Sequence, residues 1–180
     1  MNPQGAFIFL LSFAIDLYIF IVLTRFLLQL VRADFYNPVS QFVVRATNPL
    51  LQPLRKMIPG YGGVDVAALV AVVGLILFKI VLLTVLTYGA FRLAPLPLLL
   101  AVLTSLARLL LDYLFWLVIL RVILSWVAPD PRNPVVYLVA QLTEPVMAPV
   151  RRLLPPMGGL DLSPLLVLLG IQFMKILFGL

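Results

Sequence analysis

Four charged residues stand inside long apolar segments of this 180-residue chain, where a charge is rare and costly. They are Asp16, Lys79, Asp112 and Lys175. Asp16 precedes the end of its segment at Val31 by fifteen residues, about 22 Å at the rise of an α-helix. Lys79 follows the start of the next segment at Val64 by the same number. Antiparallel helices would place both charges at one depth, so we expect Asp–Lys contacts between helices.

Such pairs could form part of an ion or proton path, or they could join helices through contacts worth about 1 kcal/mol. Their side chains could also extend to the outer interface. Arg108 lies one helical turn before Asp112 and could compete with Lys175 for its carboxylate. We favour contacts between helices over conduction, because opposite charges at one depth neutralise each other and do not make a relay.

Two arginines, Arg25 and Arg121, lie six residues, or about 9 Å, from the other end of the aspartate-bearing segments. Each follows its aspartate by nine residues, half a helical turn out of phase, so the two cannot pair on one face. Their long side chains could reach the interface or meet Asp65 or Asp161. We favour a structural role for both arginines.

The other polar candidates lie in or just after two basic, proline-rich linkers, residues 32–63 and 128–159. Each linker supplies an asparagine and a basic pair, and an aspartate follows it at the start of the next span: Asn37, Arg55, Lys56, Asp65, Asn133, Arg151, Arg152 and Asp161. Each asparagine precedes a proline, which is typical of a helix start. Proline at positions 49 and 145 predicts a break that divides each linker into two short helices. Glycine pairs at 62–63 and 158–159 permit a tight turn, after which the aspartate caps the next helix.

An apolar face is predicted for the first linker helices, with the basic pair on its rim. Its members are Phe42, Val43, Leu50, Leu51 and Leu54. This pattern is typical of amphipathic helices that lie in the membrane interface, although burial against the apolar spans is an alternative. The basic pairs could hold anionic lipid headgroups, at about 1 kcal/mol for each charge, or act only as topology signals.

The two linkers are copies of each other at a spacing of ninety-six residues. Without gaps, residues 16–80 match residues 112–176 at 22 of 65 positions, which indicates an internal duplication. We therefore predict two tandem repeats, residues 1–90 and 91–180. Each would be a helix, an amphipathic linker and a helix, with spans at about 6–31 and 64–88, then 98–127 and 160–180. An even number of crossings gives both repeats one direction, so they are parallel.

Composition indicates a polytopic membrane protein, since 63% of residues are hydrophobic and 11% charged. The four long apolar segments predict an all-α fold with four transmembrane helices. The net charge of +6 fits basic loops beside membrane spans, and we expect no nucleic-acid partner. Basic residues gather in the linkers, which places both linkers in the cytoplasm and both termini outside. No basic stretch precedes the first span, so we expect it to be retained and not cleaved as a signal peptide.

Absence of cysteine and histidine from the sequence removes the usual thiolate nucleophile, the commonest general base and the usual zinc and haem ligands. We therefore expect no enzyme activity, metal or cofactor. A scaffold or assembly factor whose linkers contact anionic lipids or a partner membrane protein is the leading hypothesis. A small ion channel or transporter component built around the intramembrane Asp and Lys residues is the alternative, and a second copy of the chain is a further candidate partner.

The second copy carries a recognisable sequence: RVILSWVAPDPRNP from Arg121, then TEP, RRLLPP and GGLDLSP. It resembles the signature of the YggT family, and the resemblance covers nearly the whole chain as two copies. The first copy departs from it, with Ala33-Asp34-Phe35 in place of Pro-Asp-Pro and Ala67-Ala68 in place of Ser-Pro. The resemblance implies a small bacterial inner-membrane protein, with links to osmotic or ion tolerance, cell division and nucleoid placement, and to cytochrome maturation in plastids.

Overall fold

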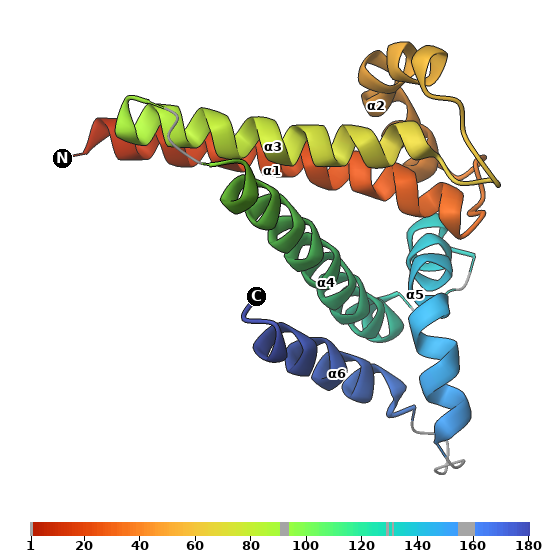
Figure 1. Ribbon diagram of the computed structural model, residues 1–180. Helices are drawn as coiled ribbons and strands as arrows, with labels where there is room; N and C mark the ends of the chain where they lie inside the picture. The colour runs from red at the N-terminus through yellow and green to blue at the C-terminus, as the bar shows by residue number, and fades with distance from the viewer. Residues whose placement is uncertain (1, 91–93, 129, 131, 155–160) are drawn as a thin grey trace. The chain divides into compact units, whose positions relative to one another are not determined.

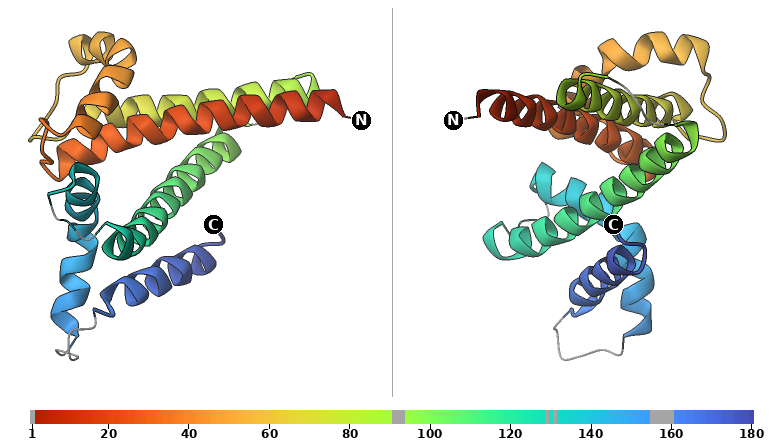
Figure 2. Two further views of the ribbon diagram at one scale, coloured as in Figure 1. Left: turned by 180° about the vertical axis from the view of Figure 1, so that it is seen from behind. Right: turned by 60° about the vertical axis from the view of Figure 1, so that its left-hand side comes forward.

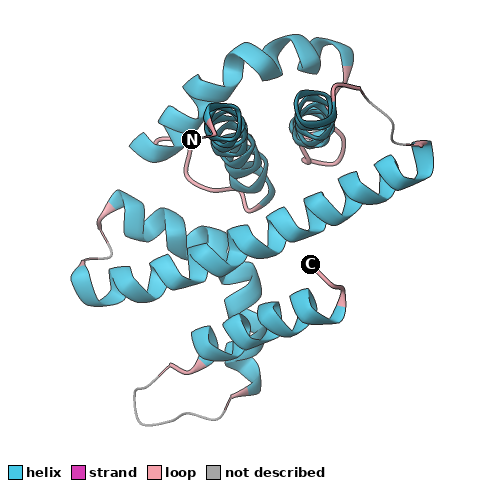
Figure 3. Ribbon diagram, turned by 90° about the vertical axis from the view of Figure 1, so that its left-hand side faces the viewer, coloured by secondary structure: helices cyan, strands magenta, loops and turns pink. Residues whose placement is uncertain are grey.

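The structure, a computed structural model, describes residues 2–90, 94–128, 130, 132–154 and 161–180. Six α-helices account for most of them (Figure 1): α1 Pro3–Leu30, α2 Pro38–Met57, α3 Val66–Tyr88, α4 Pro95–Val127, α5 Pro134–Leu153 and α6 Ser163–Leu177. Figure 3 shows that the described residues form no strand, and their β-structure is limited to one isolated bridge between Tyr61 and Val64. The predicted all-α class is confirmed.

Among the residues that the structure describes, three helices are long and apolar enough to cross a membrane: α1, α3 and α4, with 28, 23 and 33 residues. A span of about 20 residues suffices for a hydrocarbon core of roughly 30 Å. These helices match the spans predicted near 6–31, 64–88 and 98–127. The structure thus supports a membrane protein with at least these three apolar helices.

The fourth predicted span, 160–180, is shorter in the structure than expected. α6 has 15 residues, about 22 Å at helical rise. It begins only at Ser163 because the Asp161 carboxylate accepts a hydrogen bond from the Ser163 N–H at 2.9 Å in a turn. It ends at Leu177, before Gly179 turns the backbone to a φ of +65°. Four transmembrane helices therefore remain a prediction.

The chain forms two compact units that do not follow the order of the sequence. Unit 1 consists of Met1–Leu30 and Phe42–Leu106, and unit 2 of Val31–Gln41 and Ala107–Leu180. Within unit 2, the Asn37 side-chain amide donates a hydrogen bond of 2.6 Å to the Pro134 carbonyl. The start of the first linker is therefore fastened to α5. The division of the sequence into repeats at residue 90 remains a prediction.

The core of unit 1 lies between α1 and α3, which run antiparallel and side by side (Figures 1 and 2). Larger residues come from α1 and mostly small ones from α3: Ile19, Val22, Leu23, Leu28, Ala67, Ala68, Ala71, Val72 and Ile76. Small residues let two helix backbones approach closely, which gains dispersion contacts where lipid supplies no hydrophobic drive. This contact positions Asp16 opposite Lys79.

The core of unit 2 joins α4, α5 and α6. Val118 from α4, Met147 from α5, and Val167 and Ile171 from α6 form one buried cluster. Met147 is fully buried, and its flexible side chain suits an irregular junction of three helices. The cluster holds α5 against α4, which carries Arg121, and against α6, which Asp161 precedes.

α2 and α5 are each one helix, so the predicted break at prolines 49 and 145 is wrong. Two prolines lie inside each helix, and both change direction along their length (Figure 1). A proline removes one backbone hydrogen bond and bends a helix without necessarily ending it. All four prolines are on the exposed side, where solvent or lipid headgroups can satisfy the freed carbonyls. A bend toward the core is therefore tolerated.

The inner face of α2 differs from the predicted apolar face. Its most buried residues are Ser40, Val43, Thr47 and Leu51, at helical spacing. Phe42 is 62% exposed, and Leu50 and Leu54 are only partly covered. The threonine fits a buried position because its hydroxyl donates to the Val43 carbonyl at 2.7 Å. The apolar stripe is thus divided between a buried face and an exposed flank.

Candidate functional site

Asp16 on α1 and Lys79 on α3 form an ion pair within unit 1. The Lys79 ammonium lies 2.5 Å from Oδ1 and 2.6 Å from Oδ2 of Asp16. The protein covers most of the lysine, whereas the Asp16 side chain is 54% exposed. The structure contains the contact predicted from equal depth, and the bidentate geometry neutralises both charges.

Unit 2 contains the matching contact, between Asp112 on α4 and Lys175 on α6. The Lys175 ammonium lies 2.5 Å from Asp112 Oδ1. Arg108 Nε lies 3.8 Å from the other carboxylate oxygen, as the one-turn spacing predicts. Asp112 thus has two cations within reach, while Asp16 has an ion pair only with Lys79 among the described residues.

The predicted helix starts are present at both linkers. Asn37 Oδ1 accepts from the Val39 N–H, and Asn133 Oδ1 from the Val135 N–H, each at 2.9 Å. Asp65 caps α3 by accepting from the Ala68 N–H. Asp161 accepts from the N–H of Ser163, the first residue of α6, but the N-cap residue of α6 is Leu162, so the predicted cap by Asp161 is wrong. These side chains satisfy backbone donors that a helix start leaves free.

The turn after α2 uses the predicted glycine pair. Gly62 and Gly63 have φ angles of 61° and 84°, a left-handed conformation that strains other residues. The equivalent Gly158-Gly159 turn lies outside the described residues.

One of the two basic residues at the C-terminal end of α2 forms an ion pair within unit 1. Arg55 forms an ion pair with the buried Asp65 carboxylate that also caps α3. Arg25, predicted to meet Asp65, lies buried in α1 and interacts electrostatically with Asp65 and Arg55. The structure therefore gathers two arginines and one carboxylate where α1, α2 and α3 meet in unit 1.

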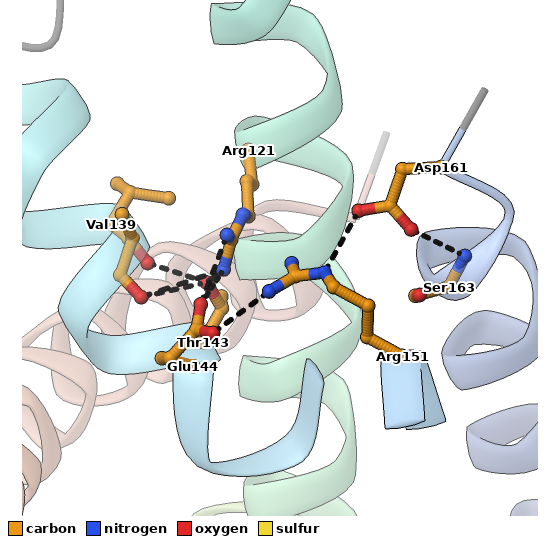
Figure 4. Close-up of polar contacts among 8 residues, drawn as sticks. Arg121, Val139, Thr143, Glu144, Arg151, Asp161 and Ser163 are labelled. Carbon is orange, nitrogen blue, oxygen red and sulfur yellow. Dashed lines mark hydrogen bonds and ion pairs between the residues drawn. The ribbon is translucent and has the colours of Figure 1, made fainter. Parts of the chain in front are cut away.

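A longer chain of charges occupies the same positions in unit 2 (Figure 4). Arg121 donates to Thr143 Oγ1 at 2.7 Å and, through both terminal nitrogens, to Glu144 Oε2 at 3.1 and 3.0 Å. Arg151 donates to the other Glu144 oxygen at 2.9 Å and to Asp161 at 3.3 Å. Glu144 thus links α4 to the end of α5, and Arg151 continues the link to the start of α6.

Sequence reasoning missed Glu144, because its partner in the first copy is Asn48 and the position was interpreted only as a helix break. It placed Arg121 near Asp161, whereas the structure places Arg151 there and pairs Arg121 with Glu144. The available signal was a carboxylate seven residues, about two helical turns, before Arg151 on a helix with a basic end. Because the two copies carry different residues at this position, comparing them did not reveal the carboxylate.

The surroundings of Glu144 lower the pKa of its carboxyl. Partial burial alone would raise its pKa, but hydrogen bonds and charges from Arg121 and Arg151 outweigh burial and hold the pKa below the ordinary value of 4.5. A carboxyl whose pKa is lowered by folding stabilises the folded state above the ordinary pKa. That contribution is lost as pH falls through the lowered pKa.

We predict that protonation of the Glu144 carboxyl at acid pH lowers the free energy of unfolding of the protein. Glu144→Gln should destabilise it at neutral pH by at most about 1 kcal/mol, since the ion pairs are partly exposed. Below pH 4.5 the free energy of unfolding should fall less steeply in the variant than in wild type. Thermal unfolding in detergent across this range measures both effects. Parallel pH profiles for the two proteins would show that Glu144 does not couple to folding.

One member of each predicted basic pair remains exposed and makes no ion pair with any described residue: Lys56 on α2 and Arg152 on α5. Exposed apolar side chains lie beside them in sequence, with Met57 at 80% exposed and Leu153 at 82%. A charge beside exposed apolar surface is typical of a helix at the membrane interface. Among the described residues, no group of acidic side chains could hold a metal ion.

The chain is similar to one protein family and to several bacterial proteins. The CCB3/YggT family model matches residues 4–86 and 100–180. An uncharacterised protein of Pseudomonas aeruginosa is 48% identical over 173 residues, covering 96% of this chain and 87% of the relative. Another from Vibrio alginolyticus is 46% identical over 172 residues, covering 95% and 92%. The uncharacterised protein YggT of Escherichia coli K12 is 42% identical over 163 residues, covering 89% and 82%. No solved structure matches the chain.

Proposed function

Because the chain belongs to the CCB3/YggT family, we propose that it is a non-enzymatic scaffold or assembly factor of the bacterial inner membrane. In this role α2 and α5 contact lipid headgroups or a partner membrane protein. One contrast carries the proposal. The charged residues of the apolar helices pair with each other, whereas the ends of α2 and α5 expose basic side chains beside apolar ones. The family resemblance extends the proposal to osmotic or ion tolerance and cell division.

The membrane arrangement is part of the proposal: four spans in two tandem parallel repeats, with both linkers cytoplasmic and both termini outside. The family model matches two stretches of similar length, and Asp16–Lys79 and Asp112–Lys175 each join residues 63 positions apart. Both observations support two equivalent repeats. The positive-inside rule supports the orientation, because the linkers carry most of the basic residues.

A small ion channel or transporter component is the second candidate. Exposure of half of the Asp16 side chain favours it, since a carboxylate lining a path must be reachable. The first candidate is favoured because each carboxylate already has a cation within hydrogen-bond distance. An ion moving along such a path would first have to displace that cation.

We predict that Asp16→Asn with Asp112→Asn leaves ion flux into liposomes unchanged relative to wild type. The same variant should give less folded protein in detergent, because two lysines lose their partners inside apolar helices. Flux measured with an ion-sensitive dye, together with size-exclusion chromatography, separates the two functions. A specific flux in wild type that the variant lacks, at equal folded amounts, would favour the channel.

Lipid contact predicts a second effect. Lys56→Glu with Arg152→Glu should weaken association with vesicles containing phosphatidylglycerol by roughly 4 kcal/mol, since four unit changes of charge at about 1 kcal/mol each are made near the headgroups. Fluorescence of the detergent-purified protein titrated with vesicles measures the change. The matched control reverses Arg32 and Arg132, which are exposed but precede the helices. Equal binding by wild type and the Lys56 and Arg152 variant would exclude these residues as lipid contacts.

A further inference from the structure

One side of α6 has no cover within unit 2. Four exposed residues on it follow one another at intervals of four, three and four positions: Leu165, Leu169, Gln172 and Ile176. This spacing places them in a single stripe along an α-helix, and it is the spacing at which two helices pack side by side. The stripe faces away from the core of unit 2, because Val167 and Ile171 on the other side of α6 make the contacts with that core.

The equivalent stripe of α3 is covered in unit 1. The corresponding residues, ninety-six positions earlier, are Leu69, Val73, Ile76 and Ile80. Ile76 is 5% exposed and belongs to the core between α1 and α3, and the other three are partly buried. The first copy therefore uses this side of the helix for a contact between helices, whereas the second copy leaves the same side uncovered.

Gln172 is the polar member of the stripe on α6. It lies nine residues after the start of α6, roughly 13 Å along the helix, and makes no hydrogen bond with any described residue. Lys175, one turn later, directs its ammonium to Asp112 Oδ1 at 2.5 Å instead. An amide without a partner is costly in hydrocarbon, where no water replaces the missing hydrogen bonds. Gln172 therefore requires a partner that supplies a donor and an acceptor.

We propose that this stripe binds the same stripe of a second copy of the chain, with the Gln172 amides of the two copies hydrogen-bonded to each other. A carboxamide both donates and accepts, so two of them are complementary, whereas lipid chains offer neither group. Two copies inserted in one direction are related by a two-fold axis along the membrane normal, so a residue near the axis meets its own counterpart at equal depth. Leu169 and Ile176 then pack above and below the amide pair. This inference rests on the proposed placement of α6 as a membrane span.

A single introduced thiol tests the contact, because the sequence contains no cysteine. Gln172→Cys in isolated membranes should form a disulfide-linked dimer on oxidation with copper phenanthroline. Met174→Cys is the matched control, since Met174 is 40% exposed at nearly the same depth and residues two apart on a helix do not share a face. The control should form little dimer. Equal yields from the two variants, or no dimer from Gln172→Cys, would overturn the inference.

A second measurement tests the amide itself. Energy transfer between copies labelled at the N-terminus, followed as the protein is diluted in lipid, gives the dissociation constant of the dimer. Gln172→Leu should raise this constant roughly ten-fold, because it removes the hydrogen bonds between the helices. Gln172→Asn retains an amide and should raise it less, and Met174→Leu should leave it unchanged. An unchanged constant in Gln172→Leu would contradict the amide pair.

Failure of the contact and failure of the membrane placement give different results. In open membranes a water-soluble maleimide should label Gln41→Cys, at an exposed position of α2, and should not label Met174→Cys. Protection of Met174→Cys without a dimer of Gln172→Cys would keep α6 as a span and overturn the contact. Labelling of Met174→Cys as fast as Gln41→Cys would remove the fourth span from the proposed function, and with it the reason for the amides to pair.

Discussion

Lys79→Met should destabilise the folded protein by about 2.5–3.5 kcal/mol, the cost of a charge left without compensation near the centre of an apolar helix. The Asp16 carboxylate would lose both of its contacts with the Lys79 ammonium. The part of Asp16 that the protein leaves uncovered faces lipid in the proposed arrangement, so water cannot replace the lysine. Unfolding of the variant in lipid bicelles by increasing denaturant measures the loss.

The matched control for this variant removes both charges together. Asp16→Asn with Lys79→Met should regain most of the stability, because neither side chain is then charged. A double-mutant cycle over the four proteins gives the interaction energy of the pair. If Lys79→Met were as stable as wild type, Asp16 would have to reach water, and the depth assigned to it would be wrong.

The equal depth of Asp16 and Lys79 was predictable because helical rise and the ends of apolar segments are both readable in the sequence. The contact of Asp112 with Lys175 was predictable for the same reason. The asparagines at 37 and 133 were predictable as helix starts from the proline that follows each of them. Each of these depends on local geometry or on one counted distance. No knowledge of how α2 or α5 packs was needed.

The pairing of Arg121 and the course of the linker helices were not predictable in this way. Whether a proline ends or only bends a helix depends on whether the freed carbonyl is exposed, which tertiary packing decides. From its spacing, Arg121 could reach the interface or meet Asp161, whereas α5, packed through Met147, brings Glu144 to it. Exposure of Phe42 follows from the same packing, because the buried stripe of α2 runs through Val43 and Thr47 instead.

The inequality of the two Asp–Lys pairs gives the last prediction. Lys175→Met alone should cost only about 1 kcal/mol, because Arg108 can approach Asp112 from its present 3.8 Å. Lys175→Met with Arg108→Gln should cost about 2.5–3.5 kcal/mol, as Lys79→Met does, since Asp112 then has no cation. The same denaturant unfolding in bicelles compares the three proteins. An equal cost with and without Arg108 would show that the arginine does not replace the lysine.

The first copy offers the converse experiment, because Ser12 occupies the position equivalent to Arg108. Ser12→Arg in the Lys79→Met background should recover part of the lost stability by placing a cation one helical turn before Asp16. Ser12→Gln, of similar length and without charge, should recover none. Recovery by the arginine alone would assign the effect to its charge. It would also show that a second cation one helical turn before the aspartate reduces the cost of losing the lysine.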